Sequence, residues 1–167
     1  MLKPAILYKE EILTKLMENN YTDNMMFYSG WIGNSLPNIE ESNDGTLYQY
    51  AIVDKGNELI GYFTYQIDWY NSCVSNFGLF AFEKNNTTIG FDVYRELKKL
   101  INDYRIHRME WRMISGNPVE KHYYRFCKRH KGKRFVFTDV FKDRCGKYHN
   151  EVIYEILFNR SENNDKK

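Results

Sequence analysis

The sequence predicts a single α+β domain built on a mixed, mostly antiparallel sheet. Three observations lead to this fold class. Short β-rich runs fill residues 46–83 and return near the C-terminus, an amphipathic helical segment separates two strand-like runs in between, and 167 residues are close to the size of one domain. A strand, a helix and a further strand in that order form a β-α-β crossover, which requires one parallel strand pair.

The N-terminal segment is predicted to be helical. In "LYKEEILTKLMENN", residues 7–20, the apolar side chains of Ile12, Leu13 and Leu16 fall on one face of a helix. We expect a second, shorter helix over residues 24–31. A polar loop ending in the turn dipeptide Asp-Gly then leads into the sheet.

Three strands are predicted next. Residues 46–54 and 58–68 are β-rich runs separated by "KGN", which favours a hairpin. Residues 75–83 are apolar on both faces, as in a central strand that is covered on both sides.

The crossover helix is predicted over residues 87–104, followed by a half-buried strand over 107–115 in which apolar and charged residues alternate. The next helix has a strong start signal, with Asn117 as N-cap, Pro118 at the first helical position and Glu120 three residues after the cap. The apolar stripe of that helix is Val119, Tyr123, Phe126, Cys127 and His130. A hairpin of the segments 134–143 and 147–158 completes the sheet.

These elements place residues 1–158 in one domain, and the polar segment 159–167 is expected to be disordered because it has nothing to bury. No apolar run approaches the roughly 18 residues of a membrane span, and the N-terminus lacks the features of a secretory signal. Three cysteines are a sparse set that fits reduced thiols. We therefore expect a cytoplasmic protein without a membrane partner.

Positive charge is concentrated in one segment. Of the 24 basic residues, seven lie between Lys121 and Arg134, and the other 17 face 22 acidic residues. A protein that binds nucleic acid in general carries a broader positive surface, so nucleic acid is not the expected partner.

The order of elements from residue 46 to residue 158 resembles the GNAT N-acetyltransferase superfamily, whose members move an acetyl group from acetyl-CoA to an amine. GNAT proteins have a bulged central strand and then a loop of the form Arg/Gln-x-x-Gly-x-Gly/Ala that opens a helix. This chain reads Asn85-x-x-Thr88-x-Gly90, so only the last glycine is kept. Exposed N–H groups at such a helix start can still bind a pyrophosphate.

A second similarity lies after the crossover. GNAT proteins often keep an Asn at the end of the following strand and a Tyr seven residues later, and Asn117 and Tyr124 match this spacing. The sequence "KGKR", which follows the helix, departs from the usual Gly-Phe of the family.

The resemblance implies direct acetyl transfer in a ternary complex of the protein, acetyl-CoA as co-substrate and a primary amine of a small molecule or protein, without a metal. It implies Tyr124 as the general acid. Glu83 is a candidate general base, Asp68 is a second candidate, and both lie near the ends of predicted central strands. A water chain is an alternative to either carboxylate. The implied acetyl-CoA contacts, including the N–H of Phe80 on the thioester carbonyl, are Leu79, Phe80, Phe82, Asn85, Asn86, Thr87, Thr88, Ile89, Gly90, Asn117 and Lys121.

In the family the acceptor sits against the N-terminal helices, here "NMMFYSGW" at 24–31, although Met25, Met26, Phe27, Tyr28 and Trp31 of this segment could equally be core residues. The assembly is expected to be a monomer or a homodimer. The missing loop glycines leave an alternative open. The chain could be a binding module on the same fold without transfer activity, which binds CoA or uses the basic helix 118–131 on nucleic acid.

The spacing of Cys127, His130, Cys145 and His149 could suit zinc. Cys127 and His130 lie on the apolar stripe of their helix, however, so we expect core residues and no metal site. The sequence contains no nucleophile elbow, Walker loop or complete dinucleotide fingerprint.

Overall fold

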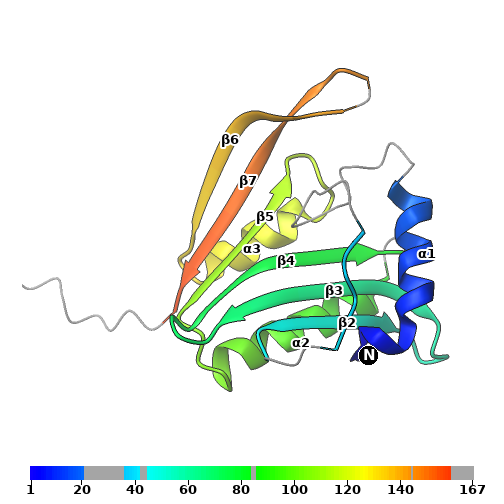
Figure 1. The fold of residues 1–167 in the computed structure, drawn as a ribbon. Helices are drawn as coiled ribbons and strands as arrows, with labels where there is room; N and C mark the ends of the chain where they lie inside the picture. Colours follow the sequence, from blue (N-terminus) through cyan, green and yellow to red (C-terminus); the bar gives the residue numbers. More distant parts are fainter. Residues whose placement is uncertain (21–35, 42–44, 84–85, 144, 159–167) are drawn as a thin grey trace, which may run out of the picture.

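The computed structural model describes residues 1–20, 36–41, 45–83, 86–143 and 145–158. They form a seven-stranded sheet with helices packed on its two faces (Figure 1). The helix predicted over 24–31 and the tail 159–167 lie outside these residues. The elements in chain order are β1 (Leu2–Pro4), the 3-10 helix η1 (Ala5–Tyr8), α1 (Lys9–Asn20), β2 (Leu47–Val53), β3 (Leu59–Asp68), β4 (Cys73–Ala81), α2 (Thr87–Asn102), β5 (Arg108–Ile114), α3 (Glu120–Arg129), β6 (Lys133–Lys142) and β7 (Tyr148–Leu157).

The strand order is β1-β2-β3-β4-β5-β7-β6. Within the described residues, β4 and β5 form the one parallel pair, joined through α2, and all the other neighbours are antiparallel. The predicted fold class, the β-α-β crossover and the C-terminal hairpin are confirmed. Strand β1 was not predicted, because three residues are too few to show an alternating pattern.

Two hydrophobic clusters cover the two faces of the sheet. Helices α2 and α3 pack on one face, where the largest cluster gathers residues of β3, β5 and β7 around Tyr65, Trp111 and Tyr154. Helix α1 packs on the other face through Ile12 and Leu16. The division follows from the alternation of side chains along each strand, which sends successive residues to opposite faces.

Helix α2 carries two acidic side chains that the sequence pattern did not place inside. Asp92 and Glu96 are 3% and 8% exposed. The Glu96 carboxylate accepts hydrogen bonds from the hydroxyls of Tyr65 at 2.7 Å and Tyr50 at 3.3 Å, and Lys99 lies 3.8 Å away. These bonds supply the partners that a buried carboxylate requires, and they fasten α2 to β2 and β3.

Helix α3 begins later than predicted. Asn117 does accept a hydrogen bond from a backbone N–H, that of Val119 at 3.0 Å, but it caps a turn and the helix begins at Glu120. The Glu120 carboxylate reaches back to the N–H of Gly116 at 3.1 Å. The prediction of Asn117 as N-cap, with Glu120 as its capping partner, is therefore wrong: the N-cap is Val119, which makes no side-chain cap bond, and the helix start is displaced by two residues from Pro118.

The turn between α3 and β6 is tightly packed at Gly132. A Cβ atom at this position would lie 2.6 Å from the Cys127 sulfur, 2.6 Å from the Glu155 carbonyl oxygen and 2.8 Å from Ile156. The Gly132 N–H also donates to the Cys127 carbonyl at 2.9 Å. Only glycine fits between the helix and the hairpin here.

None of the helices in the described segments is long and apolar enough to cross a membrane.

Candidate active site

Strands β4 and β5 separate after a short paired segment. In the described residues, their pairing comprises Cys73 with Arg108 and Val74 with Met109, although β4 continues to Ala81 and β5 to Ile114. Figure 1 shows the two strands diverging toward their carboxyl ends. The N-terminus of α2 and the start of α3 follow directly from these ends. In mixed sheets of this kind, the carboxyl ends of parallel strands are the usual place for a ligand.

A bulge in β4 contributes to the separation. Gln66 pairs with Ser75 and Thr64 with Gly78, so two residues of β4, Asn76 and Phe77, lie opposite one residue of β3. Asn76 adopts a left-handed conformation with φ of 53°, and its side-chain amide donates to Gln66 at 2.5 Å. A bulge bends its strand and increases the local twist.

The bulge also determines which backbone groups of β4 face β5. The Phe82 N–H donates to the Ile60 carbonyl of β3 at 2.9 Å, in the register that pairs Phe80 with Tyr62. Because backbone groups alternate along a strand, Phe80 also directs its N–H toward β3, whereas Leu79 and Ala81 direct theirs toward β5. The prediction that the Phe80 N–H faces the substrate is therefore corrected, and Ala81 is a position that the sequence did not single out.

Side chains of the same segment alternate between the two clusters. Leu79 packs against the α2 and α3 cluster, and Phe80 and Phe82 pack against the α1 cluster. Lys15 of α1 lies 5.9 Å from the Phe82 ring centroid.

The N-terminus of α2 lies just after β4 and has the features of an anion site. Asn86 is the N-cap, and its side-chain oxygen accepts the Thr88 N–H at 2.9 Å. The first turn of α2 contains no acidic residue. A Cβ at Gly90 would meet nothing within 4 Å, so the protein itself does not require glycine there. The other N–H groups of a first helical turn have no acceptor within the helix, and here they include the backbone of Ile89, whose side chain is buried.

Asn85 lies outside the described residues, so its predicted role stays a prediction. Thr87 is exposed at the first position of α2. Glu83 is also exposed, and its carboxylate accepts a hydrogen bond from the Asn86 side chain at 2.8 Å. Glu83 therefore lies beside the α2 N-terminus, close to where β4 leaves the sheet.

Asp68 is at the opposite end of the sheet from Glu83. It ends β3 and pairs with Cys73 at the start of β4, and the eight residue steps of β4 span roughly 25 Å. Its carboxylate accepts hydrogen bonds from the Asn71 side chain at 2.6 Å and the Asn71 N–H at 3.0 Å, which lower the pKa of Asp68. Asp68 fixes a turn there and is too distant to act together with Glu83.

The start of α3 lies over the end of β5. Asn117 is 6% exposed. Lys121 is exposed on the outer face of α3, and Tyr124 is 47% exposed one turn after Glu120. Because Glu120 pairs with Arg134 of β6 at 2.8 Å, the flank of α3 that carries Tyr124 is the one that faces β6.

The other two aromatic residues in this part of α3 are packed. Phe126 contacts Tyr94 of α2, with ring centroids 6.4 Å apart, and so marks the flank that faces α2. Tyr123 packs on Trp111 and Tyr154, with ring centroids at 6.0 and 6.4 Å. The expectation that Tyr123 belongs to the inward stripe is confirmed.

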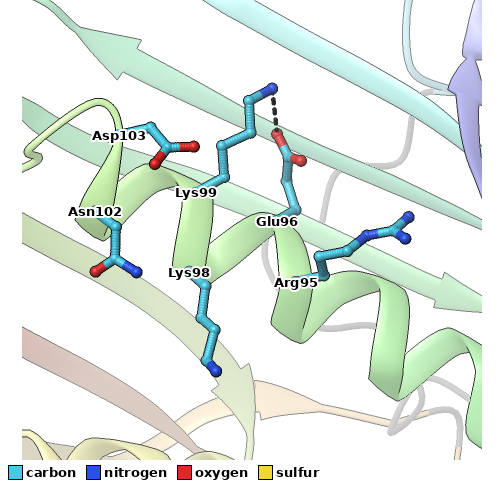
Figure 2. A pocket seen from close by; sticks show the side chains of 6 residues that line it. All are labelled: Arg95, Glu96, Lys98, Lys99, Asn102 and Asp103. Carbon is cyan, nitrogen blue, oxygen red and sulfur yellow. Dashed lines mark ion pairs between the residues drawn. The ribbon is translucent and has the colours of Figure 1, made fainter.

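A surface hollow on α2 is distinct from this region (Figure 2). All its residues come from the C-terminal half of α2 and the residue after it, and Lys98 points away from the Lys99–Glu96 ion pair. The lining residues are Arg95, Glu96, Lys98, Lys99, Asn102 and Asp103. The hollow is therefore an open helix surface at the end of α2 remote from Gly90.

Three of the four residues with zinc-like spacing have other partners or surroundings, and the fourth, Cys145, is exposed. Cys127 is buried, which raises the pKa of its thiol, and it donates to the Lys133 carbonyl at 3.4 Å. Burial also lowers the pKa of His130, which packs against Phe126. His149 lies 2.9 Å from the Asp143 carboxylate.

No family model matches the sequence, and no curated protein matches it. Solved structures do match. A spermidine N-acetyltransferase from Vibrio cholerae, in complex with CoA and spermine, is similar with a TM-score of 0.64 over 94% of this chain and 94% of that chain, at 16% identity. The chain has the GNAT fold.

Two further structures from Vibrio cholerae support this assignment. The spermidine/spermine N-acetyltransferase SpeG in complex with manganese ions has a TM-score of 0.55 over 69% of this chain and 67% of that chain, at 17% identity. A mutant form of the spermidine N-acetyltransferase SpeG has a TM-score of 0.53 over 72% of each chain, at 18% identity. The predicted resemblance to the GNAT fold is therefore confirmed by structure.

Proposed function

We propose that the protein is an N-acetyltransferase that moves the acetyl group of acetyl-CoA to a primary amine. The observation that carries the proposal is the separation of β4 and β5 directly beside the uncrowded N-terminus of α2. A similar fold binds CoA and spermine in the Vibrio cholerae enzyme. These features suit a ligand with an extended arm and a phosphate group, because strand edges can bind the arm and helix N–H groups the phosphates.

The proposed placement of acetyl-CoA follows the geometry of these elements. The pyrophosphate binds the first turn of α2 at Thr87, Thr88 and Ile89, with Gly90 allowing close approach and Asn86 at the rim, and Asn85 stays a predicted contact. The pantetheine arm runs between β4 and β5, past the backbone of Leu79, toward Asn117. Lys121 of α3 supplies positive charge to the phosphates of the adenosine end.

In the proposed reaction, the amine nitrogen attacks the thioester carbonyl carbon, and the carbon–sulfur bond then breaks. The N–H group of Ala81, which faces β5, stabilises the negative charge that develops on the carbonyl oxygen. Glu83 removes a proton from the amine through water, and Tyr124 gives a proton to the departing thiolate. Because Tyr124 lies on the β6 side of α3, this role requires the sulfur to lie above the end of β5, near Asn117.

The acceptor is proposed to be a primary amine, and polyamines are the first compounds to test because the similar structures are named for spermidine and spermine. Calorimetry with acetyl-CoA tests the first half of the proposal, and release of free CoA thiol with a panel of amines tests the second. Absence of acetyl-CoA binding at about millimolar concentration, the weak end of useful affinity, would contradict the proposal.

The exposed basic face of α3 supports a second candidate, a binding module without transfer activity. Lys121, Arg125, Lys128 and Arg129 are all exposed on this helix. Acetyl-CoA binding without CoA release on any amine would favour a CoA-binding module. Oligonucleotide binding that weakens steeply with salt would favour nucleic acid.

A further inference from the structure

The side chain of Phe91 is exposed beside the proposed phosphate site. Phe91 directly follows Gly90 on α2, and it is 66% exposed. It lies four positions after Thr87, the first residue of the helix, so the two side chains share one face of α2 and are about 6 Å apart along its axis. The outer face of α2 therefore presents an aromatic ring about one helical turn beyond the N–H groups that are proposed to bind the pyrophosphate.

The ring of Phe91 is available to a ligand, whereas the next aromatic ring along α2 is already in use. Tyr94 packs edge-on against Phe126 of α3, and the Lys98 ammonium lies 4.9 Å from the Tyr94 ring centroid. Within the described segments, no other ring and no cation packs on Phe91. A flat ligand can therefore stack on Phe91 without displacing a side chain of the protein.

The surroundings of Phe91 suit a nucleotide base better than an apolar partner. Arg95 follows one turn later, its side chain is 60% exposed, and it contacts the buried Asp92 at 3.2 Å. Figure 2 shows the Arg95 side chain extending toward the N-terminal part of α2. In the described helix, no exposed residue from Thr87 to Lys98 is acidic. One aromatic ring among polar neighbours is too small for a protein interface, but it matches a single base, and the positive charge attracts the phosphates that a nucleotide carries.

We propose that Phe91 is the stacking platform for the adenine base of acetyl-CoA. This inference rests on the proposed function, and it names the residue that distinguishes CoA from donors that lack the nucleotide. In CoA one ribose separates the adenine from the pyrophosphate. A pyrophosphate at the first turn of α2 therefore leaves the base within reach of a ring one turn further along. Replacing an aromatic ring that stacks on a base by alanine typically weakens binding by about 5- to 150-fold.

The test compares the binding of two ligands to the wild type and to Phe91→Ala by calorimetry. CoA contains the base, whereas 4′-phosphopantetheine contains the arm and a phosphate without the base. In Phe91→Ala the dissociation constant of CoA should rise by about 5- to 150-fold, and that of 4′-phosphopantetheine should not change. The variant should fold, because Phe91 is exposed and alanine is the better helix former. Phe91→Trp keeps an aromatic ring and should retain the affinity for CoA.

Tyr70→Ala is the matched control. Tyr70 is an aromatic residue that is 95% exposed in the turn between β3 and β4, at the opposite end of β4 from Glu83, so its removal should leave both affinities unchanged. Equal affinity for CoA in the wild type and in Phe91→Ala overturns the inference about Phe91 and leaves the proposed function in place. An equal loss of affinity for 4′-phosphopantetheine also overturns it, because that ligand has no base. A wild type that binds no CoA contradicts both proposals.

Discussion

The buried hydroxyl of Tyr65 donates to the buried carboxylate of Glu96 across the interface of β3 and α2, at 2.7 Å. This bond joins the central sheet to the helix whose N-terminus is the proposed phosphate site. Tyr65→Phe removes a donor to a charged group, so the free energy of unfolding should fall by about 1.5–3 kcal/mol. Urea unfolding measures it. Tyr50→Phe, which removes the longer 3.3 Å bond, should cost less, and an equal or larger loss there would contradict this order.

Alkaline pH should destabilise the protein through the same residues. Burial raises the pKa of Tyr65, and burial raises the pKa of Tyr50 to about 12. A tyrosine in the unfolded chain ionises near pH 10. Above that pH the unfolded chain loses protons that the folded chain keeps, so the free energy of unfolding falls by up to about 1.4 kcal/mol per pH unit for each such tyrosine.

The alkaline effect is checked by urea unfolding at a series of pH values. Stability should be independent of these tyrosines below pH 10, since both states are then protonated. Tyr65→Phe should make the alkaline decline shallower. A decline of unchanged slope in that variant would assign the effect to other groups.

Gly90→Ala separates fold from function in a single substitution. The added methyl group meets nothing within 4 Å, and alanine is a better helix former than glycine by about 0.8–1.0 kcal/mol. We therefore expect a small gain in thermal stability together with weaker acetyl-CoA binding, because the methyl group occupies the space proposed for the pyrophosphate. Lys98→Ala, at an exposed position of the same helix, is the control for affinity. Unchanged affinity in Gly90→Ala would remove the pyrophosphate from this position.

Ala81→Pro tests the backbone donor. The Ala81 N–H faces away from β3, so its loss leaves the β3–β4 ladder intact, whereas Ala81→Ser keeps the N–H and serves as the control. With the N–H on the thioester oxygen, the proline variant should lose roughly 10²–10³-fold in turnover, measured as release of CoA thiol. Equal turnover in the proline and serine variants would show that this N–H is not a donor to the substrate.

Tyr124→Phe tests the proposed acid. Only a partly exposed hydroxyl is lost, so folding should be nearly unaffected, and turnover should fall by about 10²–10⁴-fold with little change in acetyl-CoA affinity. Tyr123→Phe is the neighbouring control and should keep its turnover. Wild-type turnover in Tyr124→Phe would mean that the thiolate, whose thiol has a pKa near 8.5, leaves without a protein acid.

The sequence was sufficient for the order of elements along the chain from residue 46 and for the crossover, because each of these elements has a clear pattern, such as Met109, Trp111 and Met113 alternating with charged residues. It did not predict the direction of the Phe80 N–H. One left-handed residue, Asn76, shifts the alternation of β4, and an asparagine within a strand run was the one available signal. Nor did it predict that Glu96 is buried, because its tyrosine partners lie 31 and 46 positions away in the chain.

The proposed roles of Tyr124 and Glu83 depend on the ligand and so stay predictions. Spacing from Asn117 located Tyr124 on α3, but the flank that it occupies follows from the Glu120–Arg134 pair, which joins residues 14 positions apart. Helical periodicity describes one element at a time and does not show which neighbour lies on which side.

The close packing at Gly132 has a mechanical consequence. Because not even a Cβ fits at Gly132 between the end of α3 and the start of β6, and because the Gly132 N–H and the Cys127 thiol both bond across this junction, we expect a tilt of the hairpin to carry α3 with it. A force applied to the outer edge of the sheet is thus transmitted to the helix that bears Lys121 and Tyr124. The hairpin and this helix are therefore expected to move as one rigid unit, joined at Gly132.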